Sequence, residues 1–364
     1  MTLAQEIMEL ARWAPSGDNT QVWRFEFLAA NRVRVHGRDT AEELVVFDWG
    51  GIPSLLSMGC LIETAVQAAT LQGCRVDVNW LPDPGPHRYL FDLAFRHDTG
   101  IAPSPLAVGI TTRSVQRASL SRRALRADEK QALVAAAGEF QLIWLEGKQR
   151  AATARLNYNF AQPRLTMPES FHALSSAIDP DPHARYSHDR MPAGCFPLDP
   201  LSRRLMLWAL QSWPRLHSLN TLFGTALTRL QLDLLPGLRC AAHMALIAPR
   251  LPCTRADHVA SGRAFQRVWL TAEQLGLRLQ PEYTPVEFCR HVHHGLTITK
   301  IASMQNRIER LAADYAKLLA PIPEQRCLML LRLGEGPAAP ARSLRLSLAD
   351  LTVLSSSASL KGNS

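Results

Sequence analysis

A polar turn near the N-terminus carries the residue types best suited to holding a small ligand. An amphipathic helix over residues 2–14 should end at Pro15, because proline lacks the backbone N–H and its ring clashes with the preceding turn. A Ser-Gly-Asp-Asn run follows at 16–19, and an apolar strand follows at 22–28. Side-chain donors and backbone N–H groups in such a turn suit a flat polar ligand, although the same composition is typical of ordinary turns.

Two arginine-containing segments could bind an anion such as a phosphate. Arg113, Ser114 and Arg117 lie in one run, and Arg342 lies in a Pro-Ala-Arg-Ser-Leu-Arg run near the C-terminus. Guanidinium groups match the geometry of phosphate oxygens, and a hydroxyl adds a donor. The four-residue spacing would place Arg113 and Arg117 on one helix face or on the two sides of a loop. An exposed basic surface explains the pattern about equally well.

The N-terminal turn and its flanks resemble the flavin-binding signature of the nitroreductase superfamily. The similarity runs over residues 11–25 as Ala-Arg-x-Ala-Pro-Ser-Gly-x-Asn-x-Gln-x-Trp-Arg-Phe, with Val22 where the family usually has proline. The resemblance implies that the ring edge or ribityl chain of FMN is bound by Arg12, Ser16, Asn19 and Gln21. It implies that the FMN phosphate is bound by Arg113, Ser114, Arg117 and Arg342.

A late helix, expected over 258–276, extends the resemblance. Its Gly-x-Ala-x-Gln-x-x-x-Leu-x-Ala-x-x-x-Gly-Leu pattern spans 262–277 and is similar to a helix that packs in the core of the family. The resemblance implies that Gln280 and Pro281 lie beside the flavin ring, with Trp23 and Trp269 packed behind the site. In short family members the basic segment precedes the polar turn. Here it follows about a hundred residues later, which is similar to the longer ThiF-associated or Acg-like branch.

The activity that this resemblance implies is FMN-dependent oxidoreduction. Hydride would pass from NADH or NADPH to flavin N5 and on to a small organic acceptor, so that no acid–base side chain is required. A flavin-sequestering protein and a biosynthetic flavin-dependent dehydrogenase are the alternatives. Family members are usually homodimers with flavin at the interface, so we expect a homodimer or an internal pseudo-dimer.

A cysteine–histidine cluster is the main rival site. Cys289, His291 and His293 would share one face of a strand, with His294 adjacent, and both residue types bind metals. Their spacing matches no standard zinc pattern, so we expect no metal. The sequence also has no G-x-G-x-x-G, P-loop or G-x-S-x-G motif, which disfavours dinucleotide-binding, NTPase and hydrolase classes.

Bulk properties favour a globular protein that acts on small molecules. The 364 residues are 47% hydrophobic and 20% charged, with a formal net charge of +8. The basic residues are scattered, which disfavours nucleic acid as the partner and fits an anionic small molecule. Seven cysteines without a C-x-x-C pair and an N-terminus unlike a signal peptide favour the cytoplasm. The sequence contains no apolar run of 18 residues, so it predicts no membrane span.

The expected fold is α+β and nitroreductase-like, with an antiparallel central sheet flanked by helices. An N-terminal half, residues 1–105, should contain a hairpin at 22–28 and 32–36, a buried helix at 54–72, and strands at 75–80 and 88–96. A second half, residues 106–354, should carry a largely helical insertion at about 150–240. The tail at 355–364 is polar and is expected to be disordered.

Overall fold

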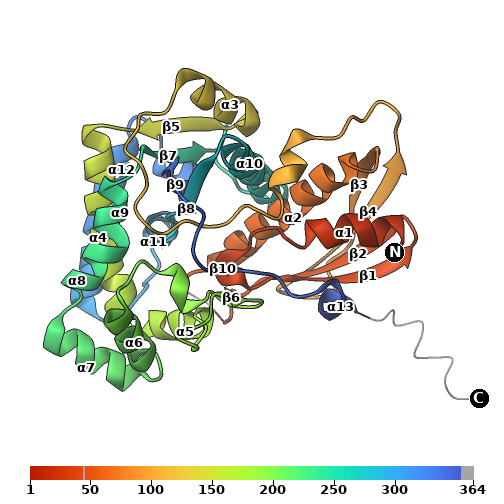
Figure 1. Ribbon diagram of the computed structural model, residues 1–364. Coiled ribbons are helices and arrows are strands. Elements are labelled where there is room, and N and C mark those ends of the chain that lie inside the picture. Colours follow the sequence, from red (N-terminus) through yellow and green to blue (C-terminus); the bar gives the residue numbers. More distant parts are fainter. Residues whose placement is uncertain (44–45, 354–364) are drawn as a thin grey trace, which may run out of the picture.

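Two four-stranded antiparallel sheets form the frame of the protein (Figure 1). The computed structural model describes residues 1–43 and 46–353. The first sheet has the order β1-β2-β4-β3 and comprises Trp23–Ala29, Arg32–Arg38, Arg88–His97 and Cys74–Trp80, respectively. The second has the order β5-β7-β9-β8 and comprises Gln141–Leu145, Ala242–Ile247, Cys327–Glu335 and Leu277–Pro281. The α+β class is as predicted, but two sheets replace the single central sheet that the sequence led us to expect.

The two sheets belong to two repeats of one α-β-β-α-β-β unit. The first repeat runs α1 (Leu3–Ala11), β1, β2, α2 (Ile52–Thr70), β3, β4, and the second runs α3 (Ala127–Ala137), β5, β7, α10 (Arg255–Gln274), β8, β9. Each sheet begins with the first strand of its repeat and pairs its four strands in the same antiparallel order. The chain is thus an internal structural duplication.

Helices α2 and α10 join the repeats at a pair of glycines. A Cβ atom on Gly59 would lie 2.1 Å from the carbonyl oxygen of Val259, and one on Gly262 would lie 2.0 Å from that of Leu56. The relation is reciprocal, because each glycine meets the residue three positions before the other. Only residues without a side chain allow the two backbones to approach so closely. The crossing is further held by ion pairs from Glu63 to Arg263 and Arg267.

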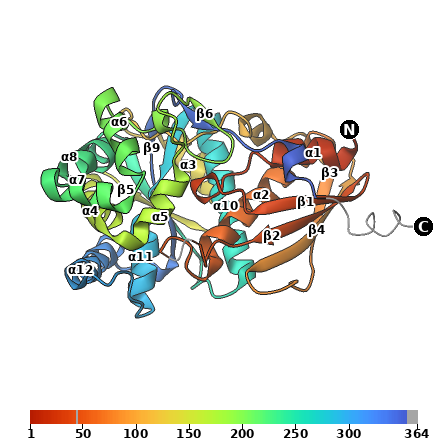
Figure 2. The same cartoon turned by 90° about the horizontal axis from the view of Figure 1, so that it is seen from below.

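The second repeat carries two large insertions. Between β5 and β7 lie six helices: α4 (Lys148–Thr166), α5 (Pro168–Ala177), α6 (Pro200–Ala209), α7 (Trp213–Phe223), α8 (Ala226–Arg229) and α9 (Leu235–Leu238). Between β8 and β9 lie α11 (Thr284–His293) and α12 (Ala302–Leu319). A strand of the first insertion, β6 (Tyr186–Ser187), pairs in parallel with β10 (Arg342–Ser343) before the final helix α13 (Leu348–Leu351). The inserted helices gather at the end of the molecule away from the first sheet, as Figure 2 also shows.

Two apolar cores follow from this arrangement. One joins the inner faces of both sheets to α1, α2, α3 and α10, and the other lies between the second sheet and the helices α4, α11 and α12. Helix α2, with the turn before it (Trp49–Thr70), is long and apolar enough to cross a membrane, but 83% of its most apolar window is buried inside the fold. That burial is what a core helix shows. The tail expected to be disordered, 355–364, lies outside the described residues.

Candidate functional site

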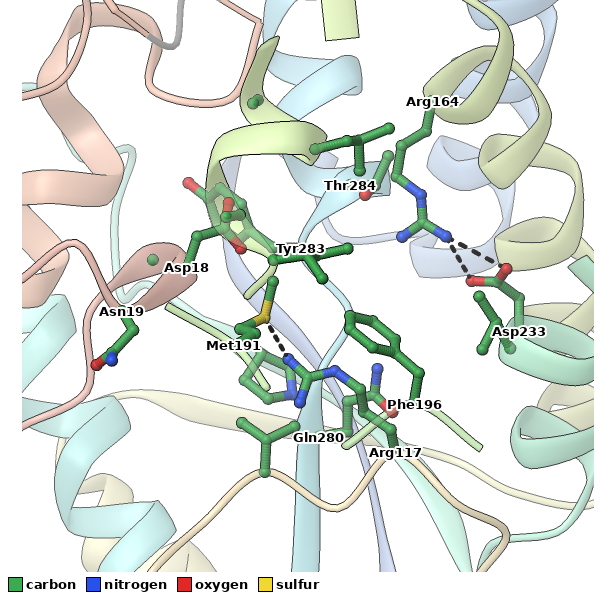
Figure 3. A pocket seen from close by; sticks show the side chains of 18 of the residues that line it. Asp18, Asn19, Arg117, Arg164, Met191, Phe196, Asp233, Gln280, Tyr283 and Thr284 are labelled. Atoms are coloured by element: carbon green, nitrogen blue, oxygen red, sulfur yellow. Dashed lines mark hydrogen bonds and ion pairs between the residues drawn. The ribbon is translucent and has the colours of Figure 1, made fainter. Parts of the chain in front are cut away.

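A cavity of about 730 Å³ lies where the first repeat, the second sheet, the first insertion and the C-terminal segment meet (Figure 3). Its size falls within the range of roughly 300–1,000 Å³ that is usual for small-molecule sites. It brings together segments separated by more than three hundred residues in sequence. The candidate residues from the sequence that line it are Ser16, Asn19, Arg113, Ser114, Arg117, Gln280, Pro281 and Arg342.

The polar turn after α1 enters this cavity in a strained conformation. Asp18, Asn19 and Gln21 have φ angles of +48°, +65° and +47°, which are the left-handed region. Aspartate and asparagine tolerate this region, whereas glutamine adopts it at a cost of about 1–3 kcal/mol. The Ser16 hydroxyl accepts a hydrogen bond from the Gln21 backbone N–H at 2.9 Å, which closes the turn. Strain that is maintained by such contacts is typical of functional sites.

The side chains of Asn19 and Gln21 fasten the turn to two distant segments. Asn19 Nδ2 faces the carbonyl oxygens of His188, Arg190 and Leu344 at 3.1–3.3 Å. Gln21 Nε2 donates to the His188 carbonyl at 2.8 Å, and Gln21 Oε1 accepts from the backbone N–H of Leu346 at 2.9 Å. We call this set of contacts the clasp. It joins the first repeat to the first insertion and to the C-terminal segment, so Gln21 positions the site and does not line it.

Arg12 is also a positioning residue in this structure. Its guanidinium donates to the Leu346 carbonyl at 2.9 Å, pairs with Glu9 and lies 5.4 Å from the ring centre of Trp13. Like Gln21, it lies outside the cavity lining. Two of the four side chains that the resemblance suggested as ring or ribityl contacts, Arg12 and Gln21, therefore support the walls.

Three arginines converge on one end of the cavity, and none of them forms an ion pair with a carboxylate among residues 1–43 and 46–353. Arg113 donates to the Trp13 carbonyl, Arg345 to the Ala14 carbonyl, and Arg342 to the carbonyls of Thr111 and Thr112. Aromatic faces also support them, because Arg113 lies 4.2 Å from the ring centre of Trp269 and Arg342 lies 5.3 Å from that of Trp13. All of these oxygen acceptors are neutral. Glu273, the carboxylate whose charge acts on Arg113 and Arg342, is paired with Arg278.

Burial and mutual repulsion make this arginine cluster (Arg113, Arg342 and Arg345) electrostatically costly. Burial lowers the pKa of Arg113 to about 10, and the charge of Arg342 contributes to this lowering. Burial, followed by the charges of Arg113, Arg342 and Arg12, lowers the pKa of Arg345 well below its ordinary value. The Nε atoms of Arg113 and Arg342 are buried and have no hydrogen-bond partner in the described part of the chain. A cluster that is held in place but left cationic is suited to a bound anion.

A second polar corner lies around Arg117. Its guanidinium contacts the sulfur atoms of Met191 and Cys195 at 2.8 and 3.3 Å and lies 5.1 Å from the ring centre of Phe196 (Figure 3). Sulfur is a weak acceptor, so much of the hydrogen-bonding capacity of Arg117 remains available. The two arginines, 113 and 117, flank an extended loop whose Val115 pairs with Leu279 of β8.

Gln280 is held beside this corner by a buried charged network. Arg332, 1% exposed, donates to Gln280 Oε1 at 3.0 Å and lies 3.8 Å from Glu282. His243 contacts Glu282 through Nδ1 at 2.7 Å and the Gly237 carbonyl through Nε2 at 3.0 Å. Burial alone lowers the pKa of His243, but Glu282 opposes this effect and the pKa is raised to about 10. Both ring nitrogens thus face acceptors, as they must in a charged imidazolium.

Asp18 is the acidic group that the turn presents to the cavity. Burial raises its pKa above the usual value of 3.8, and the charges of Arg117 and Arg164 oppose this shift. Its side chain points from the turn towards the middle of the cavity (Figure 3). The carboxylate therefore lies in the cavity, within electrostatic reach of Arg117 and Arg164.

The first insertion supplies an apolar lobe to the cavity. Its lining side chains come from α5, α6, α7 and the segment before α6, and include Leu174, Phe196, Leu205, Leu219 and Phe223. At the far side Arg164 pairs with Asp233 at 3.1 Å (Figure 3). Asp233 lies in a π-helical turn, Leu230–Leu234. This conformation is rare in proteins, and where it occurs it is often at a functional site. The cavity is thus cationic at one end and apolar at the other.

The rival cysteine–histidine site is not assembled. Residues 284–293 form helix α11, so Cys289, His291 and His293 do not share a face as they would in a strand. His294 lies instead against the ring of Trp49, with centroids 4.4 Å apart. Within residues 1–43 and 46–353, no group of three or more His, Cys, Asp or Glu side chains is placed to hold a metal ion.

Several residues of the site were missed at the level of sequence. Arg345 lies three residues after Arg342 in the same run, yet only the fold brings it to Ala14. Trp13 is adjacent to Arg12 and supports two guanidinium groups. Asp18 was recognised as part of the turn and not as a lining carboxylate. Of the two tryptophans expected behind the site, Trp269 lines the cavity and Trp23 is buried in the neighbouring core.

Comparison with known proteins does not identify a family. No protein-family profile matches the chain, and no curated protein matches it. The nitroreductase resemblance therefore rests on the residues quoted above.

Proposed function

We propose that this protein is an FMN-dependent oxidoreductase, with NADH or NADPH as the donor and a small organic molecule as the acceptor. The observation that carries the proposal is the arginine cluster at one end of a cavity that is otherwise largely apolar. A phosphate dianion offsets several buried positive charges and accepts hydrogen bonds from guanidinium groups. The adjoining apolar walls suit a planar heterocycle.

The residues of the cavity fit FMN in two parts. Arg113, Arg342 and Arg345 would hold the phosphate, and the buried Nε atoms of Arg113 and Arg342 are donors that no described residue satisfies. Ser16, Ser114 and Gln280 line the cavity and could bind polar edges of the cofactor. When bound, FMN would supply hydride transfer between donor and acceptor. The protein's own contribution would be to bind, orient and shield the cofactor.

The cofactor assignment is tested by comparing FMN with riboflavin. The wild-type protein should bind FMN more tightly, because riboflavin lacks the phosphate that the arginines recognise. Arg342→Gln should weaken FMN binding by about 10–100-fold, the range expected for a hydrogen bond to a charged group, and should leave riboflavin binding almost unchanged. Fluorescence titration measures both constants.

Arg122→Gln is the matched control, because Arg122 is an exposed arginine of the basic segment that follows Arg117. It should change neither constant. Equal binding of FMN and riboflavin by the wild-type protein, or a protein that takes up neither, would show the proposal to be wrong.

The reductase and flavin-sequestering alternatives are separated by anaerobic mixing of the FMN-loaded protein with NADH or NADPH. Loss of the flavin absorbance supports the oxidoreductase. An absorbance unchanged by both donors would leave a flavin-holding protein and exclude the reductase.

A further inference from the structure

Exposed apolar side chains gather on α6, α7 and α8, helices that also line the cavity. Seven of the fifteen large hydrophobic side chains that are exposed in the described residues lie between positions 201 and 235. Leu201, Leu222 and Phe223 are 76–78% exposed. Large exposed apolar patches mark interaction sites in proteins of this size.

The spacing on α6 places part of this surface on one helix face. Leu201, Leu205 and Trp208 are separated by four and three residues, so their side chains lie one above another along the helix. The opposite side of α6 packs inward through Leu207, in a small apolar cluster with Ile178 and Ala193. Helix α6 is therefore apolar on two sides, one packed through Leu207 and the other exposed at Leu201, Leu205 and Trp208.

The exposed surface is continuous with the apolar lobe. Leu205, Phe223 and Leu227 are exposed to solvent and also line the cavity. We call the six side chains Leu201, Leu205, Trp208, Leu222, Phe223 and Leu227 the apolar mouth. Its helices lie at the outer end of the molecule in both views (Figures 1 and 2).

The charge around the apolar mouth is mainly positive. Arg203, Arg204 and Arg215 lie on α6 and α7, Arg229 is buried, and the exposed Asp199 at the N-terminus of α6 is the acidic group beside Leu201. Arg215 lies 5.3 Å from the ring centre of Trp208, at the edge of the mouth. Apolar side chains bordered by arginine and tryptophan are the composition of segments that lie in the interface of an anionic membrane.

We propose that the apolar mouth docks on an anionic lipid bilayer, so that the apolar lobe of the cavity receives lipid-soluble ligands directly from the membrane. The docking proposal depends only on the exposed surface. The further proposal that the lipid-soluble ligand is the electron acceptor rests on the proposed function. A bilayer fits better than an acidic protein, because the apolar side chains protrude and the basic ones stand beside them. The ligand class is an apolar molecule with a chain or ring system that can occupy the space beside Leu174 and Leu219.

Docking is tested by sedimentation with phospholipid vesicles. The wild-type protein should bind phosphatidylglycerol vesicles at least ~10-fold more strongly than phosphatidylcholine vesicles, and the difference should shrink as salt screens the arginines. Leu201→Ser, Trp208→Ser and Leu222→Ser together should reduce binding to the anionic vesicles at least ~10-fold. None of these three residues lines the cavity. Arg204→Gln with Arg215→Gln should reduce binding to anionic vesicles alone by roughly 10-fold or more.

A matched control replaces exposed apolar residues elsewhere. Leu71→Ser, Val108→Ser and Leu251→Ser remove side chains that are 44%, 78% and 51% exposed, and should leave vesicle binding unchanged. An equal loss in this control, or no vesicle binding by the wild-type protein, would overturn the proposal. A dimer that the mouth substitutions abolish, with no binding to vesicles, would assign the surface to a second copy of the chain and also overturn it.

The ligand class is tested with N-phenyl-1-naphthylamine, a neutral probe that fluoresces in apolar surroundings. The wild-type protein should bind it, and Leu174→Arg should weaken binding at least ~10-fold, while thermal unfolding shows that the variant is folded. Absence of probe binding would overturn the apolar-ligand assignment. Flavin content is measured on the same samples. A colourless protein that binds vesicles would refute the flavin proposal and leave the docking proposal intact. A flavin-loaded protein that does not bind vesicles would refute the docking proposal and leave the flavin proposal intact.

Discussion

The two repeats share a topology and differ in the segments that join their elements. Eleven residues, 12–22, connect α1 to β1, whereas three residues, 138–140, connect α3 to β5. The opposite holds at the next connection, where two residues join β1 to β2 and six helices stand between β5 and β7. The first repeat thus contributes the clasp and the second contributes the apolar lobe. Two identical repeats would form two equivalent sites. Because their connecting segments differ, the two repeats here contribute different walls to one site.

The outer faces of the two sheets differ for the same reason. On β4 the side chains of Phe91, Leu93 and Phe95 are buried, while Arg88, Arg96 and His97 are exposed. Eight of the nine residues of β9 are buried, because the inserted helices α4, α11 and α12 cover its second face. Burial on both faces explains why β9 has a nearly continuous apolar sequence. At the first sheet the buried Asp92 pairs with arginines that reach solvent, whereas the charged groups of the second sheet are enclosed.

The largest effect should come from the contact between the repeats. Gly262→Val would place side-chain atoms against the backbone of Leu56, and no rotamer removes a clash that involves Cβ itself. We expect a loss of more than about 4 kcal/mol in the free energy of unfolding, at the upper end for single substitutions. Urea denaturation measures it, with Gly85→Val as the control, since nothing lies within 4 Å of a Cβ there. Equal stability of the two variants would show that the repeats do not depend on this crossing.

The enclosed charges of the second sheet should be next in magnitude. His243→Leu leaves the Glu282 carboxylate without the imidazolium that contacts it at 2.7 Å, and breaking a buried pair costs about 3–5 kcal/mol. The pKa of His243 is raised from 6.5 to about 10, so its contribution is present below pH 6.5 and is lost as the pH rises through 10. The wild-type free energy of unfolding should fall across this window more steeply than that of the variant. Parallel pH profiles would contradict the charged state of His243.

The corresponding substitution in the first sheet should cost less. Asp92 accepts from Arg34 at 2.9 Å and also pairs with Arg32, and both guanidinium groups reach solvent. Asp92→Asn should lower the free energy of unfolding by about 1 kcal/mol or less, because water solvates the arginines that remain. Urea denaturation compares it directly with His243→Leu. A loss as large as that of His243→Leu would remove the distinction between an open and a covered sheet.

The smallest effect should be at Asp18, within the clasp turn. Asp18→Asn keeps a residue type that tolerates the left-handed backbone and removes a negative charge from the lining of the cavity in which the anionic cofactor is proposed to bind. It should therefore tighten FMN binding by about threefold, as expected for a weak screened repulsion. The pKa of Asp18 is raised by burial, so the carboxylate becomes neutral as the pH falls. The ratio of FMN affinities, variant to wild type, should then approach one at acidic pH. The ratio is measured because the FMN phosphate titrates in both experiments, so its effect on affinity cancels.

Local elements could be predicted from the sequence, and the shape of the site could not. The hairpin around residues 29–32 and the helix over 54–72 have strong periodicity and clear turn residues, and both are present. The loop of Arg113 and Arg117 and the run of Arg342 were recognised because guanidinium chemistry is visible in residue types. The duplication was raised only as an alternative to a homodimer, because the two repeats share their topology but have little similarity in amino-acid sequence.

The remainder depends on contacts that no local pattern encodes. Nothing near Arg345 indicates that it meets the carbonyl of Ala14, and nothing near Gln21 indicates that its amide will hold Leu346. The two-sheet arrangement likewise follows from the reciprocal packing of Gly59 and Gly262, which are separated by about two hundred positions. Sequence patterns therefore predicted the side chains that could contact a ligand better than they predicted which other residues hold those side chains in place.

The clasp has a consequence for the order in which the chain folds. Its hydrogen bonds join Asn19 to residues 169 and 325 positions further along the chain. Closing loops of this length before other contacts form is entropically unfavourable, so the strained turn should be among the last parts to become ordered. Each repeat can form most of its own sheet earlier from nearer partners. Synthesis must reach residue 346 before the clasp can close, and we therefore expect ligand binding to report completion of the whole fold.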